Sequence, residues 1–141
     1  MILGKGTGYG IRAMAFIVRQ NGRLCGLQEI STTERIPPVF LRKVLGELRR
    51  HRLLHSVKGI HGGYQFSQPP ETVSVWDVVH VLDPNPDLDT CILGCDSAAP
   101  PCRLHDDWER MRGEIVALLR HTTISDLAGP PAARNSNEAY S

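Results

Sequence analysis

Two adjacent prolines, Pro37 and Pro38, constrain this chain most, because they separate two stretches of helical periodicity. A proline cannot continue a helix from within, but it fits the first turn of a new one. The sequence therefore predicts a short helix over 27–34, ending near Ile36, and a second helix that starts at the prolines. The apolar residues of the second helix share one face and are Leu41, Val44, Leu45 and Leu48. Two helices joined by a tight break, the second amphipathic and basic, indicate a helix-turn-helix.

A β-hairpin is predicted directly after the second helix. Two short alternating segments, 56–59 and 64–66, enclose a turn over 60–63 that contains two glycines, a pattern typical of hairpins. A hairpin in this position is typical of a wing. We interpret Lys58 and His61 as residues of its tip, and the glycines as positions where the backbone can approach a groove or a phosphate closely. An ordinary surface hairpin is the alternative.

Two further helices are predicted around this unit. Apolar residues recur on both sides of segment 9–18, so its helix should be largely buried. Segment 73–82 has one apolar face, with Ser74 as its N-cap and Asp77 in capping-box position. Prolines and a glycine then make 83–101 a loop.

An apolar stripe with steps of four and three residues follows the loop. It comprises Leu104, Trp108, Met111, Ile115 and Leu118. Such a stripe is too apolar for a solvent-facing helix and needs a partner, for which a second copy of the chain is the simplest choice. We therefore predict a homodimer through a helix within 102–127, whose last residues, 122–127, can form a short final turn of helix. Gly, Pro, Ala, Asn and Ser dominate the residues 128–141, which we expect to be a disordered tail.

Charge is divided unevenly along the chain. The net charge is +1, yet residues 1–66 hold eleven Lys or Arg residues against three acids, so the remainder is acidic. A basic half joined to an acidic half suggests a nucleic-acid-binding module fused to a module with another task. The basic run 49–52 fits phosphate contact and a solvated helix end equally well. No apolar run approaches membrane length and no export signal is apparent, so we expect a cytoplasmic protein that does not bind membranes.

Three of the four cysteines lie close together with a histidine, as Cys91, Cys95, Cys102 and His105. Soft ligands at this density are typical of a metal site, because one flexible loop can wrap one ion or one iron-sulfur cluster. In a reducing compartment, clustered cysteines are more often ligands or redox groups than disulfides. A structural zinc site of the Cys3His type and bare redox thiols are the alternatives. Cys25 lies alone in an expected turn, and we interpret it as half-buried and without a role.

Four motifs resemble the Rrf-type family of bacterial winged-helix transcription regulators, which includes IscR-, NsrR- and RirA-like iron-sulfur or redox-responsive repressors. The motifs are the segment 9–14, Phe40-Leu41 with Leu45 and Leu48-Arg49, the hairpin segments 56–59 and 62–64, and the segment 121–127. The resemblance implies a mainly α-helical fold with a small β-hairpin wing and a long C-terminal dimerisation helix. It also implies a homodimer on double-stranded DNA with a pseudo-palindromic operator, and three loop cysteines that bind the iron of a 2Fe-2S or 4Fe-4S cluster.

The chain departs from that family in its cofactor ligands. The gaps between its cysteines are three and six residues, whereas members with evenly spaced cysteines commonly have five, so the cluster type stays open. Gly8 and Arg12 stand where relatives draw an acid or a histidine from the partner's first helix. His105 is therefore our candidate for the fourth ligand.

The expected DNA contacts depart from the family as well. Pro38 and Val39 stand where many members have a small hydroxyl residue, and Arg42 replaces a frequent acid. We therefore expect a different operator. The full set of expected contacts is Pro38, Val39, Arg42, Lys43, Arg49, Lys58, Gly59, His61, Gly62 and Tyr64.

The sequence thus predicts a winged helix-turn-helix domain with a linking helix over 1–82, a cofactor loop over 83–101 and a dimerisation helix over 102–127. The predicted function is sequence-specific DNA binding by a repressor that responds to an iron-sulfur cluster or a redox signal. The alternative is a zinc-stabilised or thiol-redox regulator or adaptor. We find no nucleophile elbow, phosphate-binding glycine loop or paired carboxylates in an apolar setting, so we do not expect an enzyme.

Overall fold

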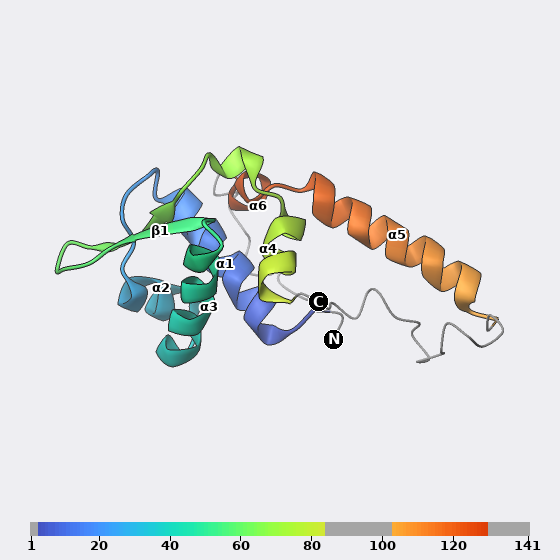
Figure 1. Ribbon diagram of the computed structural model, residues 1–141, viewed down its shortest axis with the longest axis horizontal. Coiled ribbons are helices and arrows are strands. Elements are labelled where there is room, and N and C mark those ends of the chain that lie inside the picture. The colour runs from blue at the N-terminus through green and yellow to red at the C-terminus, as the bar shows by residue number, and fades with distance from the viewer. Residues whose placement is uncertain (1–2, 84–102, 130–141) are drawn as a thin grey trace, which may run out of the picture.

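The computed structural model describes residues 3–83 and 103–129 (Figure 1). Its elements are α1 (Lys5–Arg19), α2 (Leu27–Glu34), α3 (Pro38–Arg50), β1 (Leu54–Val57), β2 (Gly63–Phe66), the 3-10 turn η1 (Pro70–Thr72), α4 (Val75–Leu82), α5 (His105–His121) and α6 (Ile124–Ala128). The hairpin and α5 extend from opposite ends of a helical body. This architecture confirms the predicted mainly α-helical fold with a hairpin wing and a long C-terminal helix.

Helix α1 forms the centre of the body and contacts α2, α3, α4 and α6. Its buried side chains include Ala13, Met14, Phe16 and Ile17. Gly10 is also buried, and a Cβ there would lie 2.3 Å from Cδ1 of Leu82 and 3.1 Å from Cγ1 of Val44. The absence of a side chain at Gly10 therefore lets α3 and α4 pack closely against α1.

Helices α2 and α3 form the predicted helix-turn-helix. Helix α2 ends at Glu34 and is followed by Arg35, whose φ of 54° is left-handed. The Ser31 hydroxyl donates a 2.6 Å hydrogen bond to the carbonyl oxygen of Ile36. Helix α3 then begins at Pro38. Its buried face is the predicted set of Leu41, Val44, Leu45 and Leu48, so the charged residues of α3 face solvent.

The strands β1 and β2 pair antiparallel, from Leu54 opposite Phe66 to Val57 opposite Gly63. Cys25 adds a bridge to the second strand: its N–H donates to the carbonyl of Tyr64 at 2.9 Å, and the N–H of Tyr64 donates to the carbonyl of Cys25 at 2.8 Å. The chain segment before α2 therefore fixes the base of the hairpin. The turn between the strands extends beyond this support.

The C-terminal helices begin with paired capping boxes. Ser74 caps α4 through Asp77, as predicted, and Thr123 caps α6 in the same way through Asp126. Extended residues precede both caps and join the two helices: the N–H of Val75 donates to Thr122 at 2.8 Å, and the N–H of Ile124 donates to Val73 at 2.9 Å.

Three boundaries differ from those expected. Helix α4 starts at Val75 rather than Val73, because Val73 is extended. The helix expected within 102–127 ends at His121, because Thr122 has extended φ and ψ of −96° and 121°, and the expected final turn of helix forms separately as α6. The expected tail from 128 overlaps α6, whose last residue, Ala128, is buried.

In the described ranges, no helix combines the length and apolar character that a membrane crossing requires.

Candidate nucleic-acid interface and cofactor loop

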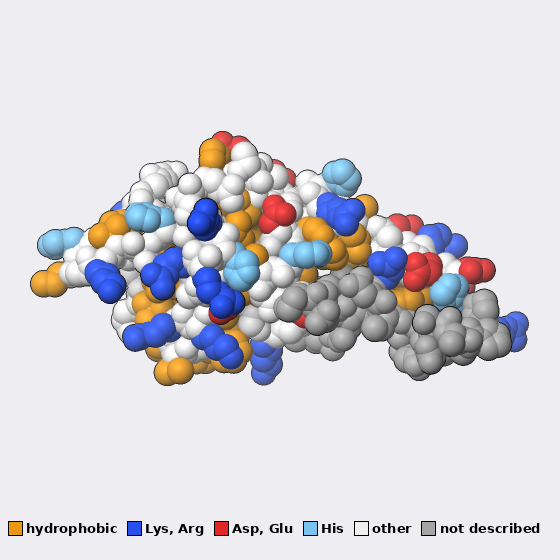
Figure 2. Space-filling view, viewed as in Figure 1, with side chains coloured by type: hydrophobic (Ala, Val, Ile, Leu, Met, Phe, Trp, Pro, Cys, Tyr) orange, Lys and Arg blue, Asp and Glu red, His pale blue; other side chains and the backbone are white. Residues whose placement is uncertain are grey.

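Lys and Arg side chains gather over α3 and the base of the hairpin on the face shown in Figure 2. Arg42, Lys43 and Arg49 are exposed, because α3 turns its apolar face into the core. Lys58 and His61 are exposed in the turn between the two strands. Cations displayed in this way create a positive potential that attracts a polyanion.

Acidic side chains do not neutralise this face. Among residues 3–66 the acids are Glu29, Glu34 and Glu47, and each pairs with an arginine that is not one of the exposed cations named above. Glu34 lies near Arg12 and Arg19, and Glu47 pairs with Arg50 at 2.6 Å. Within the described part of the chain, no ion pair involves Arg42, Lys43, Arg49 or Lys58. Their charge is available to an external partner.

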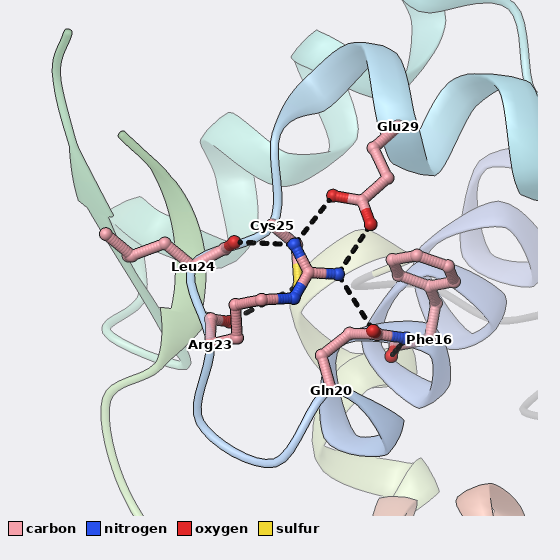
Figure 3. A network of polar contacts seen from close by, with 6 residues as sticks. All are labelled: Phe16, Gln20, Arg23, Leu24, Cys25 and Glu29. Atoms are coloured by element: carbon pink, nitrogen blue, oxygen red, sulfur yellow. Dashed lines mark hydrogen bonds and ion pairs between the residues drawn. The ribbon is translucent and has the colours of Figure 1, made fainter. Parts of the chain in front are cut away.

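The third acid, Glu29, belongs to a network around Arg23 (Figure 3). Arg23 donates to both carboxylate oxygens of Glu29, at 2.5 and 3.1 Å, and to Oε1 of Gln20 at 2.8 Å. The hydrogen bond from Arg23 lowers the pKa of Glu29, and the same pair raises the pKa of Arg23. The network links the end of α1 to α2 and so helps to orient the helix-turn-helix.

The hairpin residues expected to contact DNA fall into two groups. Lys58, Gly59 and His61 are exposed, and Gly59 has a φ of 112° that favours glycine. Gly62 is instead required within the protein, because a Cβ there would lie 2.0 Å from the carbonyl oxygen of Val57. Tyr64 is half-buried and uses its backbone in the bridge to Cys25. The close approach expected at Gly62 therefore occurs inside the hairpin, and DNA contact at these positions stays a prediction.

The first turn of α3 presents Pro38 and Val39 to solvent. The next residue, Phe40, contacts the ring of Tyr9 edge-on, with 5.5 Å between the ring centroids. This contact attaches the start of α3 to α1. The two expected contact residues thus lie on the same exposed element as Arg42 and Lys43.

Cys91, Cys95 and Cys102 lie outside the described residues, which flank them with Asp83 at the end of α4 and Arg103 before α5. His105 is described and is the half-buried first residue of α5. The described ranges alone contain no group of three potential metal-binding residues.

The donor set itself fits the expected cofactors. Three thiols and one imidazole within fifteen residues can bind the iron of a cluster or a tetrahedral zinc ion. His105 is the donor whose position is described, at the start of α5. Any group bound by this set would therefore be attached to the first turn of the long C-terminal helix.

Cys25 differs from the expected half-buried residue, because it is completely buried. Its Sγ donates a weak hydrogen bond to the carbonyl of Arg23 at 3.4 Å, and burial raises the pKa of its thiol. A high pKa and the absence of solvent both disfavour the reactive thiolate. Cys25 is thus a structural residue at the base of the wing, and its pairing with Tyr64 has no local sequence signal.

The predicted apolar stripe on α5 is not covered by the described residues of its own chain. Leu104, Met111 and Leu118 are exposed, whereas Trp108 and Ile115 are half-buried. A groove of about 600 Å³ that the sequence did not predict lies between α5 and the start of α1. Its lining is Leu3, Gly4, Lys5, Gly8, Tyr9, Arg12, Ile115 and Leu119. In the sequence, the closely spaced glycines before Tyr9 could have indicated this groove, because residues without side chains leave room beside α1.

Comparison with known proteins identifies the family. Residues 3–130 match the Rrf2 family model, described as an iron-dependent transcriptional regulator. The chain is 31% identical over 131 residues to an HTH-type transcriptional regulator of Aquifex aeolicus, covering 90% of this chain and 91% of that protein. It has the fold of CymR (YrzC), the global cysteine regulator of B. subtilis, with a TM-score of 0.78 and 24% identity over 91% of this chain and 96% of that one.

It also has the fold of IscR from T. potens, with a TM-score of 0.69 and 22% identity over 90% of this chain and 85% of that one. The family match and the Aquifex relative confirm the resemblance drawn from the sequence, and they agree with the exposed cations on α3 and the hairpin. The chain belongs to the Rrf2 family of DNA-binding transcriptional regulators.

Proposed function

We propose that this regulator is a repressor that binds a pseudo-palindromic operator as a homodimer, and that an iron-sulfur cluster or a redox change at its cysteine cluster sets its DNA binding. The observation that supports this most is the position of the cluster. Its residues connect α4, which packs on the DNA-binding body, to α5, which displays an uncovered apolar stripe. A group bound there would lie between the part of the chain assigned to DNA binding and the helix assigned to dimerisation.

DNA binding is assigned to α3 and the wing. Helix α3 has an apolar side in the core and an exposed side with cations, the form of a recognition helix in the major groove. The exposed turn of the hairpin, with Lys58, is suited to contact the adjacent backbone or minor groove. The two elements share the basic face visible in Figure 2.

Dimerisation is assigned to α5. The stripe residues Leu104, Met111 and Leu118 are exposed in the single chain, and the groove beside α1 is apolar except at Lys5 and Arg12. A second α5 would cover the stripe, and burial of large apolar side chains stabilises such an interface by about 25 cal/mol per Å². Two recognition helices fixed in this way would match half-sites about one helical turn apart.

Cofactor binding is assigned to Cys91, Cys95, Cys102 and His105. An iron-sulfur cluster bound there would supply a site that changes with oxidation or with iron supply. The protein's part is to couple that change to the orientation of α4 and α5. A coupling free energy of about 1 to 3 kcal/mol between cofactor and operator would make a useful switch.

The test combines spectroscopy with operator binding. The protein is purified anaerobically, and its visible absorption, iron and acid-labile sulfide are measured for the wild type, Cys102→Ala and His105→Ala. We expect Cys102→Ala to lose the cluster and His105→Ala to hold a more labile or differently tuned one. His121→Ala, which removes an exposed histidine from the other end of α5, is the matched control and should keep the wild-type spectrum.

Operator binding then decides whether the cofactor regulates. Holo protein, apo protein and Cys102→Ala are compared under anaerobic conditions on a duplex selected from a random pool. A difference in affinity or specificity between holo and apo protein supports the proposal. Equal affinity and specificity in all three, with zinc in place of iron and sulfide, would show a structural zinc site and contradict the sensing function.

A further inference from the structure

Two apolar side chains are highly exposed on α3 and in the hairpin turn. Val39 is 85% exposed in the first turn of α3, and Ile60 is 98% exposed in the hairpin turn; among the large hydrophobic side chains of the described residues these are the two highest values. Single exposed apolar residues are common on protein surfaces. Here, however, both lie on the elements that display unpaired cations, which indicates a partner that is anionic and also offers apolar groups.

The structure holds Val39 rigidly. Phe40 packs against Tyr9, Leu41 is buried, and the N–H of Leu41 donates to the carbonyl of Pro37 at 2.9 Å. Val39 lies between these fixed positions, and its β-branched side chain has few rotamers in a helix. Little conformational entropy remains to be lost when its methyl groups bind a partner.

Duplex DNA presents an apolar group where a recognition helix meets it. The 5-methyl group of thymine projects into the major groove beside the hydrogen-bonding edges of the bases. Val39 cannot donate or accept a hydrogen bond, so it can distinguish bases only by apolar contact. Arg42 and Lys43, one turn along α3, are placed to bind phosphates beside that contact.

We propose that Val39 is a specificity-determining residue that contacts the 5-methyl group of a thymine in each half-site of the operator. This inference rests on the proposed DNA binding and deepens it, because it names the base and the atom group that the start of α3 recognises. A protein partner is disfavoured, since the apolar area at Val39 is small and lies among cations. Pro38 restricts the backbone at this turn and adds no hydrogen-bonding group of its own side chain.

The experiment measures the contribution of a single thymine methyl group to binding. Duplexes are selected from a random pool with the wild-type protein, and each thymine of the selected duplex is then replaced by uracil, which lacks the 5-methyl group and keeps the same hydrogen bonds. We expect uracil at one position per half-site to weaken wild-type binding by about three- to fivefold, the value for one buried methyl group. Val39→Ala should bind the thymine and uracil duplexes equally.

Two matched variants provide the controls. Lys43→Ala removes a neighbouring cation, and Ile60→Ala truncates an equally exposed apolar side chain on the hairpin; both should keep the wild-type ratio between thymine and uracil duplexes. Because Val39 is exposed, its truncation should leave the thermal unfolding midpoint within about 2 °C of wild type.

The outcomes separate this inference from the proposed function. If no duplex is enriched or bound, the DNA-binding assignment itself fails. If a duplex is bound but no uracil position weakens binding, or if Val39→Ala keeps the wild-type sensitivity to uracil, DNA binding stands and the role of Val39 is refuted.

Discussion

At the scale of single residues, close contacts within the protein require glycine at positions 62 and 63 of the wing. A Cβ on Gly63 would lie 2.5 Å from the carbonyl oxygen of Cys25, and its φ of 151° is one that other residues rarely adopt. A Cβ on Gly62 would lie still closer to Val57, at 2.0 Å from its carbonyl oxygen. Gly63 is therefore explained by the junction of hairpin and core, and Gly62 by a contact within the hairpin, independently of any contact with DNA.

We expect Gly63→Ala to lower the free energy of unfolding by about 2 kcal/mol or more, through backbone clash and strain. Urea denaturation measures this value. Gly46→Ala is the matched control, because a Cβ at that position in α3 meets open space, and alanine should there raise stability by about 0.5 to 1 kcal/mol. Equal stability of Gly63→Ala and the wild type would contradict the described contact between Gly63 and Cys25.

Cys25 provides a second prediction at this scale. Its thiol is buried and has a raised pKa, so alkylation by iodoacetamide at neutral pH should occur only when the protein unfolds. Mass spectrometry of the Cys25 peptide before and after addition of denaturant measures this protection. Rapid modification in the native protein would show that the base of the wing opens readily.

At the scale of elements, local sequence patterns predicted the features that depend on residues close together in the chain. The buried face of α3 follows from helical spacing, and the N-cap of α4 follows from the spacing of Ser74 and Asp77. The bridge between Cys25 and Tyr64 and the groove beside α1 were not predicted. Each of these depends on residues far apart in sequence, which periodicity does not report. The cysteine ligands lie outside the described residues and stay predictions.

Helix α5 provides the element-scale prediction. Leu118 is 65% exposed in the single chain, so Leu118→Glu should leave the fold intact while placing a charge in the proposed dimer interface. Sedimentation velocity at micromolar concentration should then show monomers. Ala117→Glu adds the same charge at an exposed position outside the stripe and should leave the dimer intact. A wild-type monomer at this concentration, or a dimer unaffected by Leu118→Glu, would contradict the interface.

At the scale of the whole molecule, the uneven distribution of charge along the sequence gives the two ends of the protein differently charged surfaces. Unpaired cations lie over α3 and the wing, whereas Asp and Glu side chains alternate with Arg along α5 (Figure 2). Operator affinity should therefore fall with rising salt, because bound counterions leave the DNA when these cations bind.

Lys58→Ala tests the contribution of the wing to this effect. If Lys58 contacts phosphate, the slope of log affinity against log salt should decrease in magnitude by about one unit. Arg110→Ala makes the same change of net charge on α5, where Arg110 pairs with Asp107 at 3.0 Å, and should leave the slope unchanged. Fluorescence anisotropy over a salt series measures both variants. An unchanged slope and affinity for Lys58→Ala would remove the wing from the interface.

The hydrogen bonds that join Val75 to Thr122 and Val73 to Ile124 have a mechanical consequence. They hold α4 and α5 together at one end, and the two helices diverge from that junction (Figure 1). With this pivot fixed, the separation between Asp83 and Arg103 sets the angle between the helices. Helices of eight and seventeen residues are about 12 and 25 Å long. With α5 held fixed, a movement of about 1 Å at the end of α4 changes this angle. The same change of angle, with α4 held fixed, moves the far end of α5 by about 2 Å, by the ratio of those lengths.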